Sequence, residues 1–558
     1  MNINKIIVAT IATSTIILAA TPPTSGDILR EVEPRKLPKG LKAIPGIKEE
    51  KFKAPIVDDK GVKIEVKDFT IEGNTVYSSE LLLSLLDKYK NKKLTISQLQ
   101  EAASVITKYY RAHGYFVARA YIPAQELQQK NAIVQIVVIE GLYGKFSIDN
   151  SSLVKDSIAQ SYMDKLKDSQ VISIPGLERQ LLLLDELKGA VVTNTQILPG
   201  SEVGQSDFTV TLKDEARYNA YAIADNYGSR YTGRYRINAI GLVNSLTKRG
   251  DVLGINALVS NTADLKNIRL SYDTPVGYDG LALNLAVSKT MYKVGKEFES
   301  QDIHGDSLSF NAGISYPIIK QRAHSLTTSL NYTYYDITDD DIAEHKEKVL
   351  NTFSLSLEDI IKTSFLNKEG LLYSTLAVTK GNLSLNSDDA KASDIILQSE
   401  GNYEKINLSM SQTQFLVPNV SVVATLKAQK SFGKNLDGIE DISIGGALGA
   451  RSYYISEASG DNGYLASLEL FYQLPDYKRI SNTISAFIDH GKVWFNENKI
   501  TSVNERTLNS VGVGYDINYK NFSLGATYAH GFGKDKTPTS EGDDTNLNRF
   551  FFQAIARF

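Results

Sequence analysis

The sequence predicts a β-barrel membrane protein, in which an antiparallel barrel of about sixteen transmembrane strands follows two α+β modules and an N-terminal helix. Three observations predict this fold class. Residues 217–558 contain successive segments whose side chains alternate between apolar and polar, each near the ~10 residues of a tilted membrane-spanning strand. Residues 63–215 show strand and helix patterns in the same order twice. Residues 1–20 have the features of a secretory signal.

The N-terminal segment predicts that the chain is exported. Lys5 supplies a positive charge, residues 6–18 supply an apolar core, and Leu18-Ala19-Ala20 is a small-residue cleavage site. The core is shorter than the ~20 residues of a membrane-spanning helix, so a signal peptide over 1–20 is favoured over an anchor. No later apolar run reaches ~18 residues, and an exported chain of this kind can span a membrane only as a closed barrel.

Residues 21–62 predict a short helix and a linker. The helix is expected over about 27–33 and contains Asp27, Ile28, Leu29 and Arg30. An acidic residue near a helix start is favourable because it faces the positive end of the helix dipole. The linker is basic and is punctuated by Pro34, Pro38, Pro45 and Pro55. These residues alone leave two interpretations open, a disordered tether or a detachable plug on a linker.

Residues 63–142 predict a compact module with the order β-α-α-β-β. Alternating apolar and charged residues from Val62 indicate a first strand, which ends in a turn at Gly73 and Asn74. Serine and threonine residues can cap both helices. The expected elements after the turn are a helix from 78 or 79 through 88, a second helix from 95 that ends at Gly114, and strands over 116–122 and 133–139.

Residues 143–215 repeat this order with a weaker pattern. The expected elements are a strand over 144–148, helices over 157–166 and 175–187, and strands over 191–198 and 207–212. Two tandem modules of one kind indicate a repeated binding unit rather than a catalytic domain.

Residues 216–558 are predicted to form the barrel because short and long connections alternate along this part of the chain. The short connections include 274–277, 417–419 and 520–521, and the long ones include 336–348, 382–401, 435–463 and 531–548. This alternation is typical of barrels with tight periplasmic turns and longer outer loops. A soluble β-sandwich is disfavoured, because so many apolar outward faces would aggregate without lipid. The last strand ends the chain at Phe558.

The loop 435–463 is expected to fold into the barrel. It contains the sequence GGALGARSYY at 445–454, and glycine permits the backbone to fold closely over itself. A later strand places Ser485, Phe487 and Asp489 on its polar face. Arg451 of an inward-folded loop could therefore reach Asp489. On the pattern alone, an exposed loop with a solvated arginine is an equal alternative.

Composition and motifs exclude several classes of function. The net charge of −3 gives no argument for nucleic acid, and the absence of cysteine excludes disulfides and thiolate sites. The six histidines form no close ligand pair, and no nucleophile elbow is present. The acidic run 336–341 lacks the spacing of a calcium loop, so a solvated loop is expected there. No catalytic site, metal site or cofactor is predicted.

The order of segments resembles the TpsB family of two-partner secretion transporters, of the haemolysin activator and filamentous-haemagglutinin transporter type. This family belongs to the POTRA-plus-barrel superfamily. The first module resembles a POTRA domain at 66–74, 110–115, 122–123 and 138–141, and the second resembles the second POTRA at 177–179, 198–200 and 204–207. The start of the barrel, Asp225-Asn226-Tyr227-Gly228, is also similar. The resemblance therefore implies POTRA 1 over 63–142 and POTRA 2 over 143–215, with Gly73, Asn74, Gly114 and Tyr115 as POTRA positions.

The resemblance also implies a site in the pore. In the family, the loop between the eleventh and twelfth strands carries a Val-Arg-Gly-Tyr motif, which matches Ala450-Arg451-Ser452-Tyr453 with serine in place of glycine. The family's Phe-x-Asp motif matches Phe487-Ile488-Asp489. Arg451 is then expected to pair with Asp489 and hold the loop in its transport-competent position. The supporting residues are Tyr453, Phe487, Gly445, Gly446 and Gly449, and Phe558 is expected to serve barrel assembly.

The function implied is that of an outer-membrane translocator in a Gram-negative bacterium. Its POTRA domains would recognise the secretion domain of a large β-rich exoprotein, a TpsA-type haemolysin or adhesin, and the barrel would export that chain unfolded. Expected partners are this exoprotein, outer-membrane lipid and the barrel-assembly machinery. The alternatives are a barrel-assembly and insertion factor, a passive porin, and a barrel phospholipase. Two POTRA modules behind a helix and linker favour export.

Overall fold

The structure, a computed structural model, describes residues 22–33, 41, 63–128, 130–262, 264–365, 367–455, 457–496, 505–533 and 546–558. The predicted signal peptide and all but one residue of the predicted linker lie outside the described residues. Within the described ranges, no helix is both long and apolar enough to cross a membrane.

Sixteen strands of the described chain close into an antiparallel barrel, which confirms the predicted fold class. The strands are β8 (Tyr218–Asp225), β9 (Arg236–Asn244), β10 (Val252–Ser260), β11 (Leu265–Val276), β12 (Leu281–Lys293), β13 (His304–Lys320), β14 (His324–Asp340), β15 (His345–Phe365), β16 (Lys368–Leu385), β17 (Gly401–Val417), β18 (Val420–Phe432), β21 (Asn462–Gln473), β22 (Ile480–Trp494), β23 (Glu505–Tyr519), β24 (Phe522–Gly531) and β25 (Asn548–Arg557). Each strand pairs with the next, and β25 closes the barrel against β8 over Tyr221–Asp225.

The two faces of each strand follow the alternation seen in the sequence. On β22, Ile484 and Ile488 are exposed on the outer face, whereas Phe487 and Asp489 are buried on the inner face. The same division holds on β25, where Phe550 is exposed and Arg549 is buried. Successive side chains of a strand point to opposite faces, so one face meets lipid and the other lines the lumen.

Two of the predicted connections are wrong. Residues 336–348 are not a long loop, because β14 continues to Asp340 and β15 begins at His345, so the acidic run lies mostly in a strand rather than in a solvated loop. Cross-strand pairing explains the difference: Asp339 lies opposite Lys346, and opposite charges across a strand pair are favourable. Strand β15 has 21 residues, well beyond the ~10 expected for a span. Residues 274–276 also belong to a strand, and the turn follows them.

The first module is a four-stranded sheet of order β2-β1-β4-β3 covered by helices. Its elements are β1 (Ile64–Glu72), α2 (Ser79–Ser84), the 3₁₀ turn η1 (Asp87–Tyr89), β2 (Lys92–Leu94), α3 (Ile96–Ala112), β3 (Arg119–Tyr121) and β4 (Ala132–Ile139). Thr95 and Gln98 form a capping box at the start of α3, and Leu99, Ile106 and Tyr110 bury one face of this helix against the sheet. The short β2 was not predicted, and β3 is shorter than the predicted 116–122.

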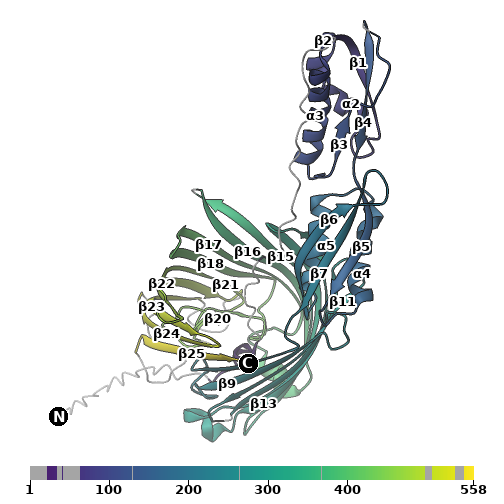
Figure 1. Cartoon of the computed structure of the whole chain (residues 1–558). Helices are drawn as coiled ribbons and strands as arrows, with labels where there is room; N and C mark the ends of the chain where they lie inside the picture. The colour runs from purple at the N-terminus through teal and green to yellow at the C-terminus, as the bar shows by residue number, and fades with distance from the viewer. Residues whose placement is uncertain are drawn as a thin grey trace, which may run out of the picture.

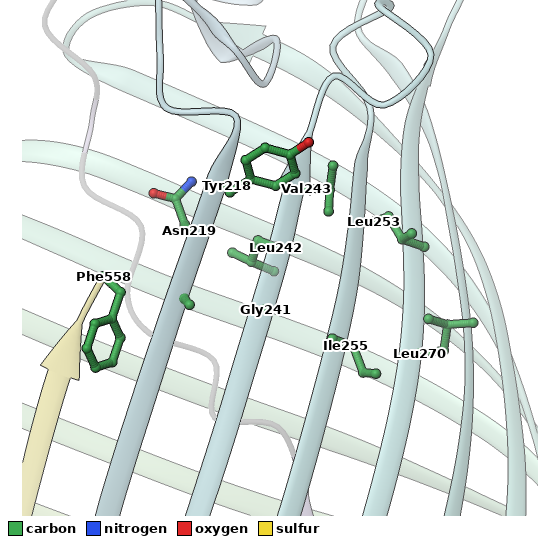
Figure 2. A pocket seen from close by; sticks show the side chains of 10 residues that line it. Tyr218, Asn219, Gly241, Leu242, Val243, Leu253, Ile255, Leu270 and Phe558 are labelled. Carbon is green, nitrogen blue, oxygen red and sulfur yellow. The ribbon is translucent and has the colours of Figure 1, made fainter.

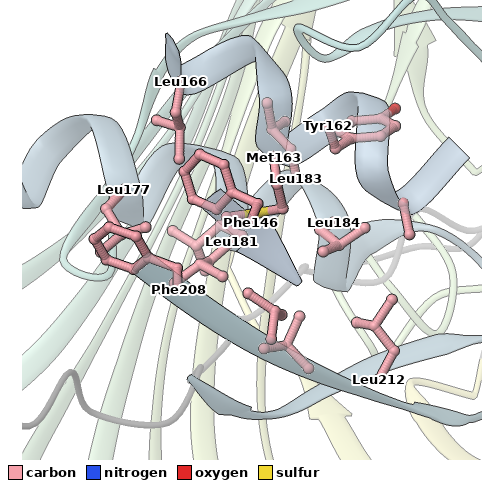
Figure 3. Packing of buried hydrophobic residues seen from close by; sticks show 14 of the residues in the cluster. Phe146, Tyr162, Met163, Leu166, Leu177, Leu181, Leu183, Leu184, Phe208 and Leu212 are labelled. Atoms are coloured by element: carbon pink, nitrogen blue, oxygen red, sulfur yellow. The ribbon is translucent and has the colours of Figure 1, made fainter. Parts of the chain in front are cut away.

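The second module is a three-stranded sheet of order β5-β7-β6 with its helices on one face. Its elements are β5 (Leu142–Asn150), α4 (Asp156–Asp164), the 3₁₀ turn η2 (Lys165–Ser169), α5 (Ile174–Glu186), β6 (Ala190–Pro199) and β7 (Gln205–Asp214). Figure 3 shows the core, where Phe146 and Phe208 stack near Leu177 and Leu181 of α5.

The second module is seated on one end of the barrel, and the first module lies beyond it (Figure 1). From α5, Arg179 donates to the carbonyl of Pro317, near the end of β13, at 2.8 Å and pairs with Asp279, in the turn between β11 and β12, at 3.3 Å. The backbone N–H of Lys155 donates to the carbonyl of Lys248, in the turn between β9 and β10. These contacts identify this end of the barrel as the one that carries the short turns.

Candidate functional site

The loop between β18 and β21 folds into the barrel, and three glycines permit its path. A Cβ atom on Gly445 would overlap the carbonyl oxygen of Tyr454, and one on Gly449 would overlap the carbonyl oxygen of Gly445. Gly446 has a φ of +94°, a conformation that glycine adopts without strain. The short strands β19 (Ile442–Ser443) and β20 (Ser459–Gly460) pair at the base of the loop.

The structure brings Arg451 of this loop against Asp489 of β22. The guanidinium donates from Nε to Oδ2 at 3.0 Å and from Nη2 to Oδ1 at 2.8 Å, and the backbone N–H of Arg451 donates to Oδ2 at 3.2 Å. The side chain of Asp489 has 0% of its surface exposed. Arg451 and Asp489 therefore form a buried, bidentate ion pair. Charge-assisted hydrogen bonds of this kind are strong, and removing one partner would leave an unfavourable unpaired charge in the interior.

Three further polar residues hydrogen-bond to this ion pair, and none of them was among the predicted site residues. Glu469 of β21 accepts from Nη1 of Arg451 at 2.8 Å, so one guanidinium is held by two carboxylates. Ser467 donates to Oδ1 of Asp489 at 2.7 Å, and Ser510 donates to Oδ2 at 2.7 Å. The sequence carried a signal for the two β21 residues, because Ser467 and Glu469 share the polar face of the strand next to β22.

The supporting motif residues pack around the ion pair. The guanidinium carbon of Arg451 lies 3.3 Å from the ring centroid of Phe487, a cation–π contact. Tyr453 is fully buried in a cluster with Ile444 and Leu508. Ser452, which stands where the family motif has glycine, is fully buried against Gly531, and its hydroxyl donates to the carbonyl of Asn509 at 3.4 Å.

Helix α1 (Ser25–Val32), dark purple in Figure 1, lies inside the barrel. It begins two residues before the predicted start because Thr24 and Asp27 form a capping box there. Ile28 is buried against Leu258 and Tyr292, which belong to barrel strands. The predicted helix residues thus have distinct roles: Asp27 caps the helix, Ile28 anchors it, and Leu29 is half-buried.

Two charged residues tie α1 to the lumen. Arg30 donates to the carbonyl of Gly438, in the inward-folded loop. Glu31 is buried and accepts from the backbone N–H of Ser229 at 3.2 Å and the hydroxyl of Thr232 at 3.3 Å. Burial raises the pKa of Glu31 from 4.5 to about 7, an effect that nearby Arg236 partly opposes. Neither Glu31 nor Arg236 was among the predicted site residues.

The POTRA positions lie far from the lumen in the first module. Gly73 has a φ of +80°, and a Cβ there would overlap the carbonyl oxygen of Val138. Asn74 donates to the carbonyl of Tyr77 at 2.8 Å. Gly114 accepts from the backbone N–H of Ile174, which joins the two modules. The Tyr115 ring packs edge-on against those of Tyr77 and Tyr110, and Phe558 is exposed on the outer face of the barrel.

In the same module, the side chain of Glu140 accepts several hydrogen bonds. It accepts from the backbone N–H groups of Thr75 and Val76 and from the hydroxyl of Tyr110. Burial alone would raise the pKa of Glu140, but its hydrogen bonds outweigh this effect and lower it. These contacts fix the turn after β1 against α3, which is a structural role.

Known proteins resemble the chain in both sequence and fold. The family model for haemolysin secretion/activation protein ShlB/FhaC/HecB matches residues 204–517, and the model for the ShlB-type POTRA domain matches residues 64–141. The heme/hemopexin transporter protein HuxB of Haemophilus influenzae strain 86-028NP is 26% identical over 97% of this chain and 96% of its own length. The solved structure of CdiB from Escherichia coli has a TM-score of 0.75 at 19% identity, covering 90% of this chain and 92% of CdiB.

Proposed function

The chain belongs to the haemolysin secretion/activation family of outer-membrane transporters, and we propose that it exports a large β-rich exoprotein, unfolded, through its barrel. The transporter lies in the outer membrane with its POTRA domains in the periplasm. The observation that carries the export proposal is the content of the lumen. Helix α1 and a loop held by Arg451 occupy it, and a passive pore needs neither of them.

The exoprotein passes through the lumen that helix α1 and the inward-folded loop occupy. Helix α1 leaves the lumen on its linker, while the pair of Arg451 and Asp489 keeps the inward loop against the wall. The exoprotein then passes in extended form, and its folding outside prevents return. The cargo is of the TpsA type, a class of large exoproteins to which haemolysins and adhesins belong.

Capture of the exoprotein takes place on the two periplasmic modules, POTRA 1 over 63–142 and POTRA 2 over 143–215. An extended segment can bind such a module by adding a strand to a sheet edge. Strand β6 suits this role, because it pairs with β7 on one side and with no described strand on the other. The opposite edge is partly closed, since Leu142 of β5 bridges to Val171. Val191 and Leu198 of β6 are exposed apolar side chains at the open edge.

Replacing both Val191 and Leu198 with lysine is expected to lower export at least several-fold. Lysines on an edge strand discourage strand addition, and both side chains are already exposed, so the module should stay folded. The measurement is the amount of exoprotein released from cells that express the variant. The matched control is Val203→Lys, which changes an apolar side chain with 93% exposure in the nearby loop. Normal export by the double variant would reject β6 as the capture strand.

A further inference from the structure

The strands of the barrel carry different chemistry on their two faces. On the outer face, apolar side chains such as Ile255 and Leu270, which Figure 2 labels, are exposed to lipid. Phe353 and Leu355 of β15 are exposed in the same way. Successive side chains of a strand point to opposite faces, so Ser354 between them points into the lumen.

Five inward residues of β13, β14 and β15 form a continuous surface, which we call the polar wall. Its members are uncharged, and each is half-buried: Ser315, Ser329, Asn331, Ser354 and Ser356. Ser329 lies opposite Ser315 on one side and Ser356 on the other, and Asn331 lies opposite Ser354. Within the described part of the chain, the hydroxyls of Ser315, Ser329 and Ser356 have no hydrogen-bond partner. They are therefore available to a molecule that passes through the lumen.

The polar wall lies in two rows of paired residues that cross β13 to β16. The rows are Ser315, Ser329, Ser356 and Ala377, and then Gly313, Asn331, Ser354 and Thr379. None of these side chains can ionise. By contrast, the ion pairs of Arg451 with Asp489 and of Arg236 with Asp225 lie on other strands of the barrel.

Charged side chains beside the two rows have partners of their own. Glu358, in the next row of β15, accepts from the hydroxyl of Tyr373 at 3.0 Å. Lys405 of β17 pairs with Glu440 of the inward-folded loop at 2.7 Å. Asp273 lies two strands away from the wall, on β11. The wall is therefore bordered by charges, but its own surface offers only hydroxyl and amide groups.

The periplasmic end of the polar wall opens into a cavity of about 730 Å³ between the second module and the barrel. Ser315 and Ser329 line this cavity together with Leu182 and Leu183 of α5. Leu41 also lines it. Leu41 precedes both modules in the sequence, so a part of this chain already lies where a polypeptide from the periplasm would enter.

The other end of the polar wall meets the base of the inward-folded loop. Leu436 of this loop packs with Leu350 of β15 and Leu383 of β16. Both strand residues lie further from the second module than the wall does, because β15 runs from Leu350 toward Ser356 and the cavity. The wall thus extends from the entrance cavity to the loop that Arg451 holds.

We propose that the polar wall is the surface along which the extended exoprotein passes, an inference that rests on the proposed function of export. An extended chain presents a backbone N–H and a carbonyl at nearly every residue, and hydroxyl and amide side chains can both donate and accept. Such a wall replaces water for a chain of any sequence, whereas fixed charges would retain segments of opposite charge. Passage requires contacts that are strong enough to admit the chain and weak enough to release it.

The absence of cysteine from the chain allows a direct test by disulfide cross-linking. Ser329→Cys and Ser356→Cys each place one thiol on the wall with little change in size. Thr527→Cys and Gln553→Cys are the matched controls, because both residues are half-buried and inward on β24 and β25, across the barrel from β14 and β15. The exoprotein carries one cysteine and is stalled in transit by a folded domain fused to its C-terminal end.

A mild oxidant is added to membranes that hold the stalled exoprotein, and each yield is normalised to labelling of the same thiol by a small maleimide. Disulfides are expected to be several-fold more frequent at residues 329 and 356 than at residues 527 and 553. Equal or higher yields at the two controls would overturn the polar wall and leave export through the barrel standing. A stalled exoprotein that reacts at none of the four positions would contradict export through the barrel as well.

A charge placed on the polar wall tests its role in passage. Ser329→Asp is expected to lower the amount of released exoprotein several-fold, because a carboxylate there retains basic segments of the chain. Thr527→Asp is the matched control across the barrel and should export near the parent level, and heat-modifiable gel mobility checks insertion of both variants. Parent-level export by Ser329→Asp, or an equal loss in both variants, would overturn the role of the wall.

Discussion

Replacing Arg451 with alanine is expected to abolish export of the exoprotein while the barrel still inserts into the membrane. The change leaves Asp489 fully buried without its cation, next to Glu469, which has lost the same partner. Breaking a buried ion pair in this way typically costs ~3–5 kcal/mol, enough to release the loop from the wall. The measurement is exoprotein in the medium, with insertion checked by heat-modifiable gel mobility.

The other variants of this site sharpen the prediction. Asp489→Ala should also abolish export, because Arg451 then keeps only Glu469 as a charged partner. The exchange Arg451→Asp with Asp489→Arg should not restore it, since a carboxylate at position 451 would face Glu469. Lys492→Ala is the matched control on the same strand, where an exposed pair with Glu505 is worth ~1 kcal/mol or less. Export at the parent level by Arg451→Ala would reduce this residue to a loop contact without a role in transport.

The helix in the lumen is expected to block the pore less well as the pH rises from about 4.5 to about 7, because Glu31 binds a proton in the docked state. The pKa of Glu31 is about 7 when docked and returns toward 4.5 when the helix is released. Docking is therefore favoured below pH 4.5, weakens through this range and levels off above pH 7, with a total change of more than about tenfold. The measurement is the open probability of the purified protein in planar bilayers between pH 4.5 and pH 8.

Glu31→Gln tests the assignment of this proton. The variant cannot ionise and can still accept hydrogen bonds from Ser229 and Thr232, so its open probability should stay low and vary little with pH. Glu33→Gln removes an exposed carboxylate just after the same helix and should behave like the parent protein. If the parent and Glu31→Gln show the same dependence on pH, the titrating group is elsewhere.

The barrel could be predicted from the sequence because its main signal, the alternation of apolar and polar side chains along each strand, is local. Alternation with period two assigns each side chain to lipid or lumen, as Ile488 and Asp489 show, without knowledge of any long-range contact. For the acidic run at 336–341 the same reasoning gave a wrong prediction. Its composition is that of a loop, and only the lysines of the paired strand explain why Asp339 lies in a strand.

The site was predictable in part for a related reason. Arg451 and Asp489 carry family motifs, and their contact follows once the loop folds inward. Ser510 and Glu31 carried no such signal. Ser510 reaches Asp489 through the register of β22 with β23, and Glu31 meets Ser229 across about two hundred residues of chain. Register and the closure of the barrel place these partners, and neither is encoded in a local pattern.

Reconstituted translocation tests the central claim most directly. The purified full-length chain is placed in liposomes with its POTRA modules on the outside, and an unfolded exoprotein encoded in a neighbouring gene is added without ATP. Export through the barrel predicts that this exoprotein becomes resistant to external protease, and that the Arg451→Ala protein gives no protection. Exoprotein that stays fully digestible, while unrelated barrel proteins insert into the same liposomes, would contradict export and identify an assembly factor instead.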